Sequence, residues 1–251
     1  MMEHGFSLVL PSNSSPELFP ENVISHFKVK VAKPINLSSD SWFVGLREIS
    51  FPQSWSNVQH GWIQIDYGDT GRIVKFQLKS GYYHNASVLL DQIHQVFVNG
   101  HVETKVTVYH DNITDRIMVR VVDEQLRICF SQQICNLLGF DTGPDKKFDH
   151  GVHTGERMID MMEGFSSLYV YSNLVQNRRV GDSLVPLLRH VPFDSSKRRK
   201  HHWVQFRHIE YLPIASCNTD VIEIDIRRDD GSRVSFETGK VVVTLHFIQR
   251  I

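Results

Sequence analysis

The sequence predicts an all-β fold, a β-sandwich or jelly roll, with a few short helices. Three observations lead to this expectation. Apolar and polar residues alternate with a period of two over many short stretches, which is typical of strands with one buried face. Polar turn sequences separate these stretches, whereas helical spacing of apolar residues is rare. The chain has 251 residues, 41% of them hydrophobic, and this is enough for a sizeable core.

The first half of the chain contains four clear strand patterns. Residues 27–31 (FKVKV) place apolar side chains on one face and lysines on the other, and residues 62–67 (WIQIDY) alternate in the same way. Residues 105–109 and 116–122 flank a loop, 110–115, that is rich in Asn and Asp. This arrangement predicts a β-hairpin.

The second half ends in three further strand patterns. Residues 221–226 (VIEIDI) and 233–236 flank the sequence Asp-Asp-Gly-Ser at 229–232. An Asp-Gly pair favours a hairpin, because glycine accepts positive φ at the turn. Five of the eight residues at 240–247 (KVVVTLHF) are apolar, which predicts a strand in the interior of its sheet.

Helix signals occur at three places. Asn85 or Ser87 can cap a helix that runs through about Val98, because the apolar residues between them share one face and Asn-Gly follows. A second short helix is expected over 131–138, where a glycine follows it, and a third near 157–163. The segments 141–155 and 194–202 are expected to be long loops.

Charge and cysteine content exclude several classes of protein. The 27 Lys and Arg residues balance 28 Asp and Glu residues, so we expect no specific nucleic-acid binding. The three cysteines, Cys129, Cys135 and Cys217, form no C-x-x-C motif, which argues against a disulfide scaffold or a cysteine-built zinc site. Cys129 lies in an alternating strand pattern and is expected in the core. The reduced interior of a cell fits this usage.

No targeting or membrane-spanning segment is expected. The N-terminus lacks a basic region before its short apolar run, so it does not resemble a signal peptide. No apolar run approaches the roughly 20 residues that cross a bilayer. The four Asn-x-Ser/Thr sequons are read as chance occurrences for the same reason.

Histidines are the first place to look for chemistry. His201, His202 and His208, with Glu210, could suggest a metal site on a jelly roll, but no His-x-His pair occurs and the ligand set is incomplete. We expect neither a metal nor a cofactor. An enzyme that holds a metal through histidines on a jelly roll is kept as a further, less favoured hypothesis.

Nucleophile and phosphate-binding motifs are also absent. The sequence has no G-x-S-x-G elbow, Walker A loop or G-x-G-x-x-G. Asp182, Asp229 and Asp230 lie at turns, where carboxylates usually cap backbone amides. We therefore expect that the protein is not an enzyme.

Two segments are candidates for contacts with partners. Aromatic residues gather in one stretch that includes Trp42, Phe51 and Trp55, which can serve the core or a subunit contact. The basic run at Lys197, Arg198, Arg199 and Lys200 can be a solvated loop, or it can meet phosphate or an acidic partner surface.

Several strings resemble a known family as a set. They are LPSNS at 10–14, KPINL at 33–37, WFVGLREISFPQSW at 42–55, LYVYS at 168–172, VGDSLVPLLR at 180–189, IEIDIRRDDG at 222–231, and VTLHF at 243–247. Together they resemble the penton, or minor capsid, proteins of Polinton/Maverick elements and adintovirus-like viruses. The resemblance covers about 6–98 and 165–248 and is thin over about 100–162.

The resemblance implies a single jelly-roll β-sandwich. Its strands would come mainly from 6–67 and 165–248, and 70–162 is a candidate inserted α/β subdomain. It also implies a structural virion protein that forms homopentamers at the fivefold vertices of an icosahedral capsid, beside a double-jelly-roll major capsid protein. Assembly is expected inside the host cell, in the nucleus.

A ring of five identical subunits needs two different surfaces that meet. We assign subunit contacts to Trp42, Phe51, Trp55, Leu184, Leu187 and Arg189, and a partner-binding loop to the basic residues at 197–200. The alternative function is a β-sandwich recognition module, for host attachment or ligand binding, without catalysis.

Overall fold

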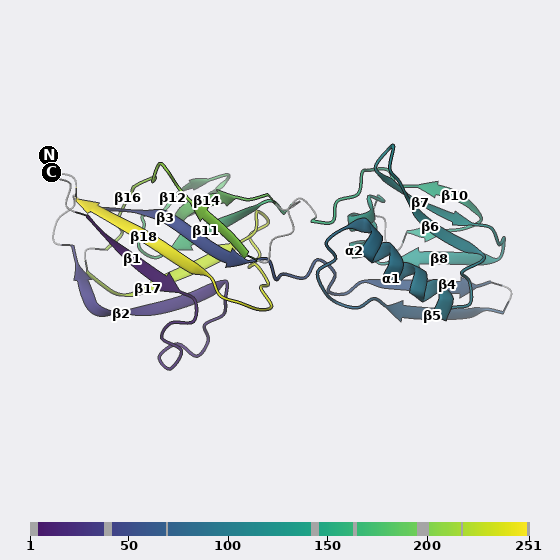
Figure 1. Cartoon of the computed structure of the whole chain (residues 1–251), viewed down its shortest axis with the longest axis horizontal. Helices are drawn as coiled ribbons and strands as arrows, with labels where there is room; N and C mark the ends of the chain where they lie inside the picture. The colour runs from purple at the N-terminus through teal and green to yellow at the C-terminus, as the bar shows by residue number, and fades with distance from the viewer. Residues whose placement is uncertain are drawn as a thin grey trace. The chain divides into compact units, whose positions relative to one another are not determined.

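The computed structural model describes residues 5–37, 42–68, 70–141, 146–162, 165–194, 201–216 and 218–249. The chain divides into two compact units. The first unit combines Met1–Trp55 with Phe165–Ile251, and the second is Ser56–Gly164. The second unit is therefore inserted into the chain of the first (Figure 1).

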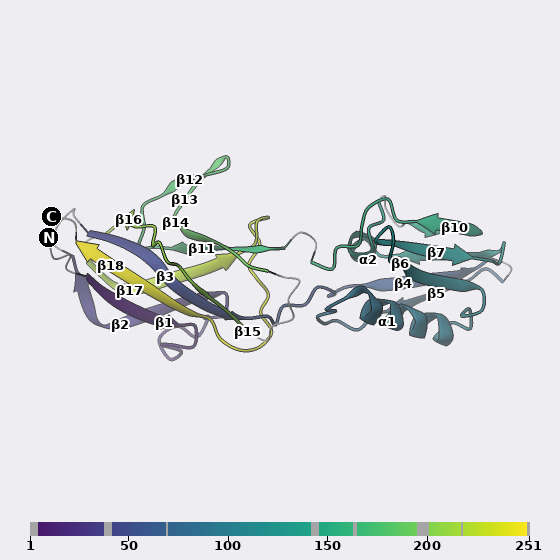
Figure 2. The same cartoon turned by 45° about the horizontal axis from the view of Figure 1, so that its top comes forward.

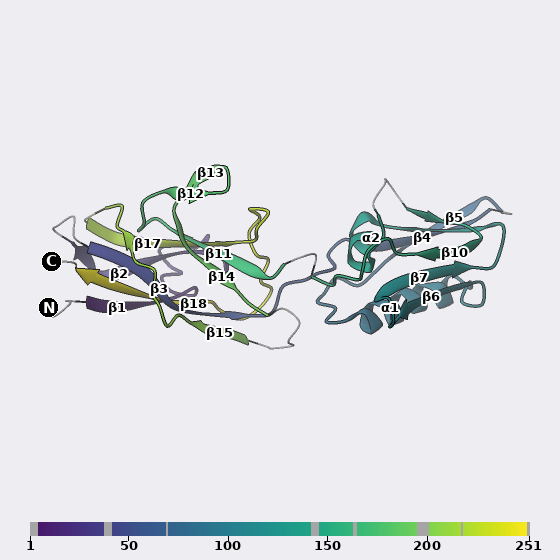
Figure 3. The ribbon, with the colours of Figure 1, turned by 90° about the horizontal axis from the view of Figure 1, so that it is seen from above.

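The first unit is a sandwich of two antiparallel sheets. One sheet has the order β1-β18-β3-β15, with β16 also paired to β3, and the other has the order β14-β11-β17-β2. The bounds are β1 Gly5–Pro11, β2 His26–Asn36, β3 Trp42–Pro52, β11 Ser167–Ser172, β14 Leu187–Pro192, β15 His201–Gln205, β16 Leu212–Pro213, β17 Asn218–Arg227 and β18 Val242–Gln249. Figure 3 shows the two layers, with β11 and β17 in one and β1 and β18 in the other.

The strand order is that of a jelly roll. If the eight strands of the two main paths are numbered along the chain, one sheet takes them in the order 1-8-3-6 and the other in the order 5-4-7-2. Each sheet thus draws on both halves of the chain, and the first strand pairs with the last, Gly5 opposite Ile248. This confirms the predicted all-β jelly-roll fold.

The two-residue alternation places the core between the sheets. Ile222, Ile224 and Ile226 of β17 are fully buried, while the residues between them face outward. In the facing sheet, β18 lies between β1 and β3 as expected, and its Leu245 and Phe247 are buried. Apolar burial of this kind is the main force that holds two sheets together.

The outer edge of β2 is covered by side-chain hydrogen bonds. Asn22 donates from Nδ2 to the carbonyl oxygen of Lys28 at 2.9 Å, and its Oδ1 accepts from the Lys28 amide at 2.8 Å. The Lys30 amide donates to the Ser15 hydroxyl at 3.2 Å. The loop before β2 therefore takes the place of a further strand and protects this edge from unspecific pairing.

The second unit has its own strands, helices and core. Its sheets have the orders β5-β4-β8-β9 and β10-β7-β6, and its apolar side chains form one buried cluster. The bounds are β4 Trp62–Tyr67, β5 Arg72–Gln77, α1 Ala86–Asn99, β6 Val106–Asp111, β7 Arg116–Val121, β8 Leu126–Phe130, α2 Gln132–Leu138, β9 Lys147–Phe148 and β10 Gly151–Thr154.

Local chemistry sets the start of α1 and the end of α2. The Asn85 side chain accepts a hydrogen bond from the Val88 amide at 3.0 Å and so caps α1. Gly139 ends α2 with φ of +79°, in the left-handed region. A Cβ there would lie 2.3 Å from the carbonyl oxygen of Arg157. Both the positive φ and this close contact therefore favour glycine at the position.

Four local expectations were wrong. Residues 157–162 form no helix, because their amides donate to distant carbonyls, as Asp160 does to Leu137. The segment 141–155 is not only loop, since it holds β9 and β10. Residues 233–236 form isolated bridges, because β17 is already paired on both edges by β11 and β2. The strand at 62–67 belongs to the second unit, where it pairs with β5 and β8.

Candidate functional site

The outward face of the β14-β11-β17-β2 sheet carries a dense set of charges. The alternation that buries the isoleucines of β17 turns Glu223, Asp225 and Arg227 outward. In the register of the sheet, Asp225 lies opposite His26 of β2, and Glu223 opposite Lys28. Acidic side chains of one strand thus meet basic side chains of the next, which stabilises the pairing.

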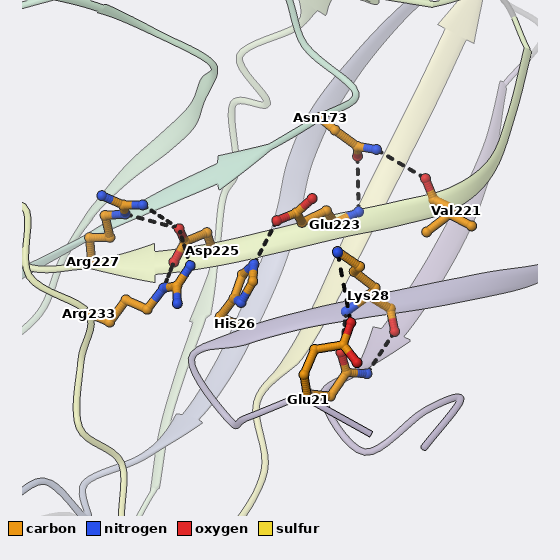
Figure 4. A network of polar contacts seen from close by, with 10 residues as sticks. Glu21, His26, Lys28, Asn173, Val221, Glu223, Asp225, Arg227 and Arg233 are labelled. Atoms are coloured by element: carbon orange, nitrogen blue, oxygen red, sulfur yellow. Dashed lines mark hydrogen bonds and ion pairs between the residues drawn. The ribbon is translucent and has the colours of Figure 1, made fainter. Parts of the chain in front are cut away.

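The ion pairs on this face form within β17 and between β17 and its neighbours (Figure 4). His26 Nε2 lies 2.6 Å from Glu223 Oε1. Asp225 contacts two guanidinium groups, with 2.7 Å from its Oδ2 to Arg227 Nη2 and 3.1 Å from its Oδ1 to Arg233 Nε. Bonds to two arginines offset the cost of largely removing the Asp225 carboxylate from water.

An asparagine completes the sheet where β11 ends. Asn173 Oδ1 accepts from the Glu223 amide at 2.9 Å, and its Nδ2 donates to the Val221 carbonyl at 3.1 Å (Figure 4). The side chain therefore continues the backbone ladder along β17 for one more step. The hydrogen bond from its amide to Asn173 helps to fix the position of Glu223 on this face.

A pocket of about 770 Å³ opens on this face. Its lining includes Tyr169 and Tyr171 of β11 and Glu223 and Asp225 of β17. One wall is the hairpin of β12 (Arg178–Val180) and β13 (Ser183–Val185), whose strands pair only with each other among the described strands. Figures 2 and 3 show this hairpin projecting from the sandwich. The turn at 229–231 also lines the pocket.

Two of the lining groups have shifted pKa values. Hydrogen bonds from the hydroxyl and the amide of Ser232 lower the pKa of Asp230, so this carboxylate is charged at neutral pH. Burial raises the pKa of Tyr171, so its phenol stays neutral. The described lining includes no histidine, cysteine or lysine. The pocket thus offers carboxylates and aromatic faces to a ligand.

Three of the residues predicted for subunit contacts are buried in the chain itself. Phe51 and Leu187 lie in the interior of the first unit, and so does Trp55, at 1% exposure. Their side chains pack against other parts of the same unit, as Trp55 does against Phe165 at 5.1 Å between ring centroids. They therefore have no surface to offer a neighbour, and the earlier assignment is corrected to a role in the core.

The other three predicted contact residues are accessible to different degrees. Leu184 is 63% exposed on the projecting hairpin. Trp42 is partly buried beside Phe6, with 5.9 Å between ring centroids. The guanidinium of Arg189 lies 4.4 Å from the Phe206 ring centroid and pairs with Glu210 at 3.2 Å. These residues stay predictions.

The predicted basic loop, Lys197, Arg198, Arg199 and Lys200, lies outside the described residues, as does Cys217. Within the described ranges, no three His, Cys, Asp or Glu residues are placed to hold a metal. His202 is buried and contacts Gln53 Oε1 at 3.1 Å. Across the same ranges, none of the helices has the length and apolar character needed to cross a membrane.

Sequence reasoning missed the pocket although its parts were visible. Asp182, Asp229 and Asp230 were read as turn residues, and the last does bond its own turn through Ser232. The signal that was available was the acidic face of 221–227, opposite the isoleucines. Only the fold of the hairpin over the sheet brings Asp182 to the same cavity.

The fold defines the class of protein: a single jelly roll with a separate unit inserted between its third and fourth strands. The whole chain has the fold of a viral penton protein. The penton protein of mavirus aligns with 98% of this chain and 100% of its own, at a TM-score of 0.53 and 11% identity. A chain of the Sputnik virophage aligns over 98% of both chains, at a TM-score of 0.51 and 11% identity. No protein-family model and no curated protein matches the sequence.

Proposed function

We propose that this chain is a structural virion protein, a penton or minor capsid protein. The observation that carries the proposal is the match to the mavirus penton protein over the full length of both chains. This match includes the inserted unit as well as the jelly roll, so the similarity extends beyond a widespread sandwich fold. At 11% identity the similarity is one of fold, and the role is our inference from it.

The finer proposal is a homopentamer at the fivefold vertices of an icosahedral capsid. The described chain contains one jelly roll, and a major capsid protein built from two would have to be a separate partner. A pentameric ring is a closed heterologous assembly, in which one surface of each subunit meets a different surface of the next. The subunits would assemble in the host nucleus and act in the virion without catalysis.

The native mass of the purified full chain tests this proposal. Light scattering or native mass spectrometry over a range of protein concentration and salt should find a species near five times 29.0 kDa. A defined assembly of another size would contradict the pentamer. A monomer under all conditions would favour the recognition-module alternative, for which the pocket of about 770 Å³ is the candidate binding site.

A further inference from the structure

The pocket on the outer face of β17 has an excess of negative charge. Five carboxylates line it, from Asp182, Glu223, Asp225, Asp229 and Asp230. They come from the β12–β13 hairpin, from β17 and from the turn that follows it. Asp225 is paired with Arg227 and Arg233, and Glu223 lies beside His26, so the excess is carried by Asp182, Asp229 and Asp230. The chain as a whole has a net charge of only −1, so this is a local concentration of charge.

The three carboxylates at the pocket walls are bound by neutral donors. Asp182 Oδ1 accepts from the Ser183 hydroxyl at 3.1 Å, and Asp229 Oδ1 accepts from the Asp230 amide at 3.1 Å. Asp230 Oδ1 accepts from the Ser232 amide and hydroxyl at 2.8 and 2.6 Å. These bonds hold the carboxylates in place, and the nearby charge of Arg228 also acts on Asp230. The remaining negative charge can act on a ligand.

The cavity suits the side chains of lysine and arginine. Carboxylates bind guanidinium and ammonium groups through charge-assisted hydrogen bonds. Tyrosine faces add cation–π attraction, and Arg227 already lies 5.8 Å from the Tyr171 ring centroid. A volume of about 770 Å³ lies within the roughly 300–1,000 Å³ of pockets that hold ligands of drug size. It therefore fits a short basic segment better than a folded domain.

The chain itself contains such a segment. Residues 197–200 read Lys-Arg-Arg-Lys, the densest positive charge in the sequence. This segment joins β14, an edge strand of the pocket's sheet, to β15, an edge strand of the opposite sheet. The pocket is lined by Val185 and Pro186, just before β14 begins, whereas the segment follows the other end of β14, after Pro192. A second copy is therefore the better source of the segment.

We propose that the pocket of one subunit binds the 197–200 segment of the neighbouring copy. This inference rests on the proposed pentamer, because it supplies the two different, complementary surfaces that a closed ring requires. Charge complementarity between them would set the register of the subunits and speed their encounter. Raising the salt concentration should weaken the contact.

Peptide binding tests the pocket directly. The probe is a fluorescent peptide of residues 194–202 (DSSKRRKHH), and the receptor is the full chain with 197–200 replaced by serines, so that its own segment does not compete. Adding Asp182→Asn, Asp229→Asn and Asp230→Asn should weaken binding about tenfold, which corresponds to about 1.4 kcal/mol. Asparagine retains the acceptor oxygens of these turns, so the fold should persist, as thermal unfolding would verify.

A matched control removes three exposed acids of the second unit. It carries Asp91→Asn, Glu103→Gln and Glu124→Gln and should bind the peptide as the parent does. A peptide with glutamine at 197–200 should not bind. Equal binding by the pocket variant and the control variant, or no binding by the parent, would overturn the proposal.

Native mass then tests whether the contact joins two copies. The pocket variant and the serine variant should each need about tenfold more protein than the wild type to form pentamers, whereas the control variant should not. If the wild type is pentameric and the pocket variant is equally so, the docking inference is wrong while the pentamer stands. If the wild type stays monomeric, the pentamer is wrong, and docking between copies is wrong with it.

Discussion

Trp55 belongs to a residue type that is enriched at interfaces, but here it lies in the core. Its ring lies 5.1, 5.6 and 6.0 Å from the ring centroids of Phe165, Phe193 and Phe236. Phe165 and Phe193 also meet edge to face at 5.3 Å. Such packing combines a large buried apolar area with favourable aromatic geometry. Trp203 has the opposite environment, at 61% exposure on the edge strand β15.

We predict that these two tryptophans differ sharply in their effect on stability. Trp55→Ala should lower the free energy of unfolding by about 3–5 kcal/mol, because it leaves a large cavity. Trp203→Ala is the matched control and should change it by less than about 0.5 kcal/mol. Guanidinium denaturation followed by circular dichroism measures both. Similar losses in the two variants would contradict this account of the core.

Asp111 should titrate below its ordinary value. Bonds from the Thr114 hydroxyl and the Ile113 amide lower its pKa from 3.8. Because the folded-state pKa is depressed, the stabilisation by this carboxylate is present above about pH 3.8 and is lost as the pH falls through the folded-state pKa. Thr114→Val should move the pKa back towards 3.8, as measured by NMR titration. An unchanged pKa in this variant would show that the hydroxyl is not the main cause.

At the scale of the element, β17 determines both the core and the charged face. Its isoleucines close the sandwich, and its acidic residues point to the pocket. The alternation in the sequence predicted these two faces, since a strand places successive side chains on opposite sides. The partners of the strand were not predictable in the same way, because pairing with β2 and β11 depends on residues far away in the chain.

The β12–β13 hairpin should be dispensable for folding and necessary for the pocket. Its ends, Arg178 and Val185, are cross-strand partners, so Asn-Gly can replace residues 179–184 and close a two-residue turn. We expect the thermal unfolding temperature to change by only a few degrees, because β12 and β13 pair only with each other among the described strands. Binding of the 194–202 peptide should be lost.

Each outcome for the shortened hairpin has a distinct meaning. A large fall in the unfolding temperature would show that the hairpin supports the sandwich. Unchanged peptide binding would show that the hairpin is not a wall of the functional pocket. Circular dichroism and fluorescence anisotropy on the same preparation separate the two.

For the whole molecule, the insertion of one unit into the other is the main feature of the architecture. The chain leaves the first unit after Trp55 and returns at Phe165, and the rings of these two residues are in contact. The jelly roll can therefore close without the insertion. Each unit also buries its own apolar side chains.

We predict that the first unit folds without the second. A chain in which residues 57–163 are replaced by a short Gly-Ser linker should give a single cooperative unfolding transition with the circular dichroism spectrum of a β protein. Trp55→Ala in this shortened chain should cost as much as in the full chain, which serves as an internal control. An unfolded product would show that the insertion is required for the jelly roll to form.

Sequence by itself determined the features that depend on neighbouring residues. Alternation located β2, β4, β6, β7, β17 and β18. The cap formed by Asn85 and the left-handed conformation of Gly139 set one limit of each helix. Resemblance of short strings indicated the jelly roll. Tertiary structure alone decided that the strand at 62–67 belongs to the insertion, that Trp55 is core, and that Asp182 joins the acids of β17. The reason is physical: local hydrogen bonding and side-chain direction are encoded locally, whereas the pairing of distant strands depends on packing of the whole chain.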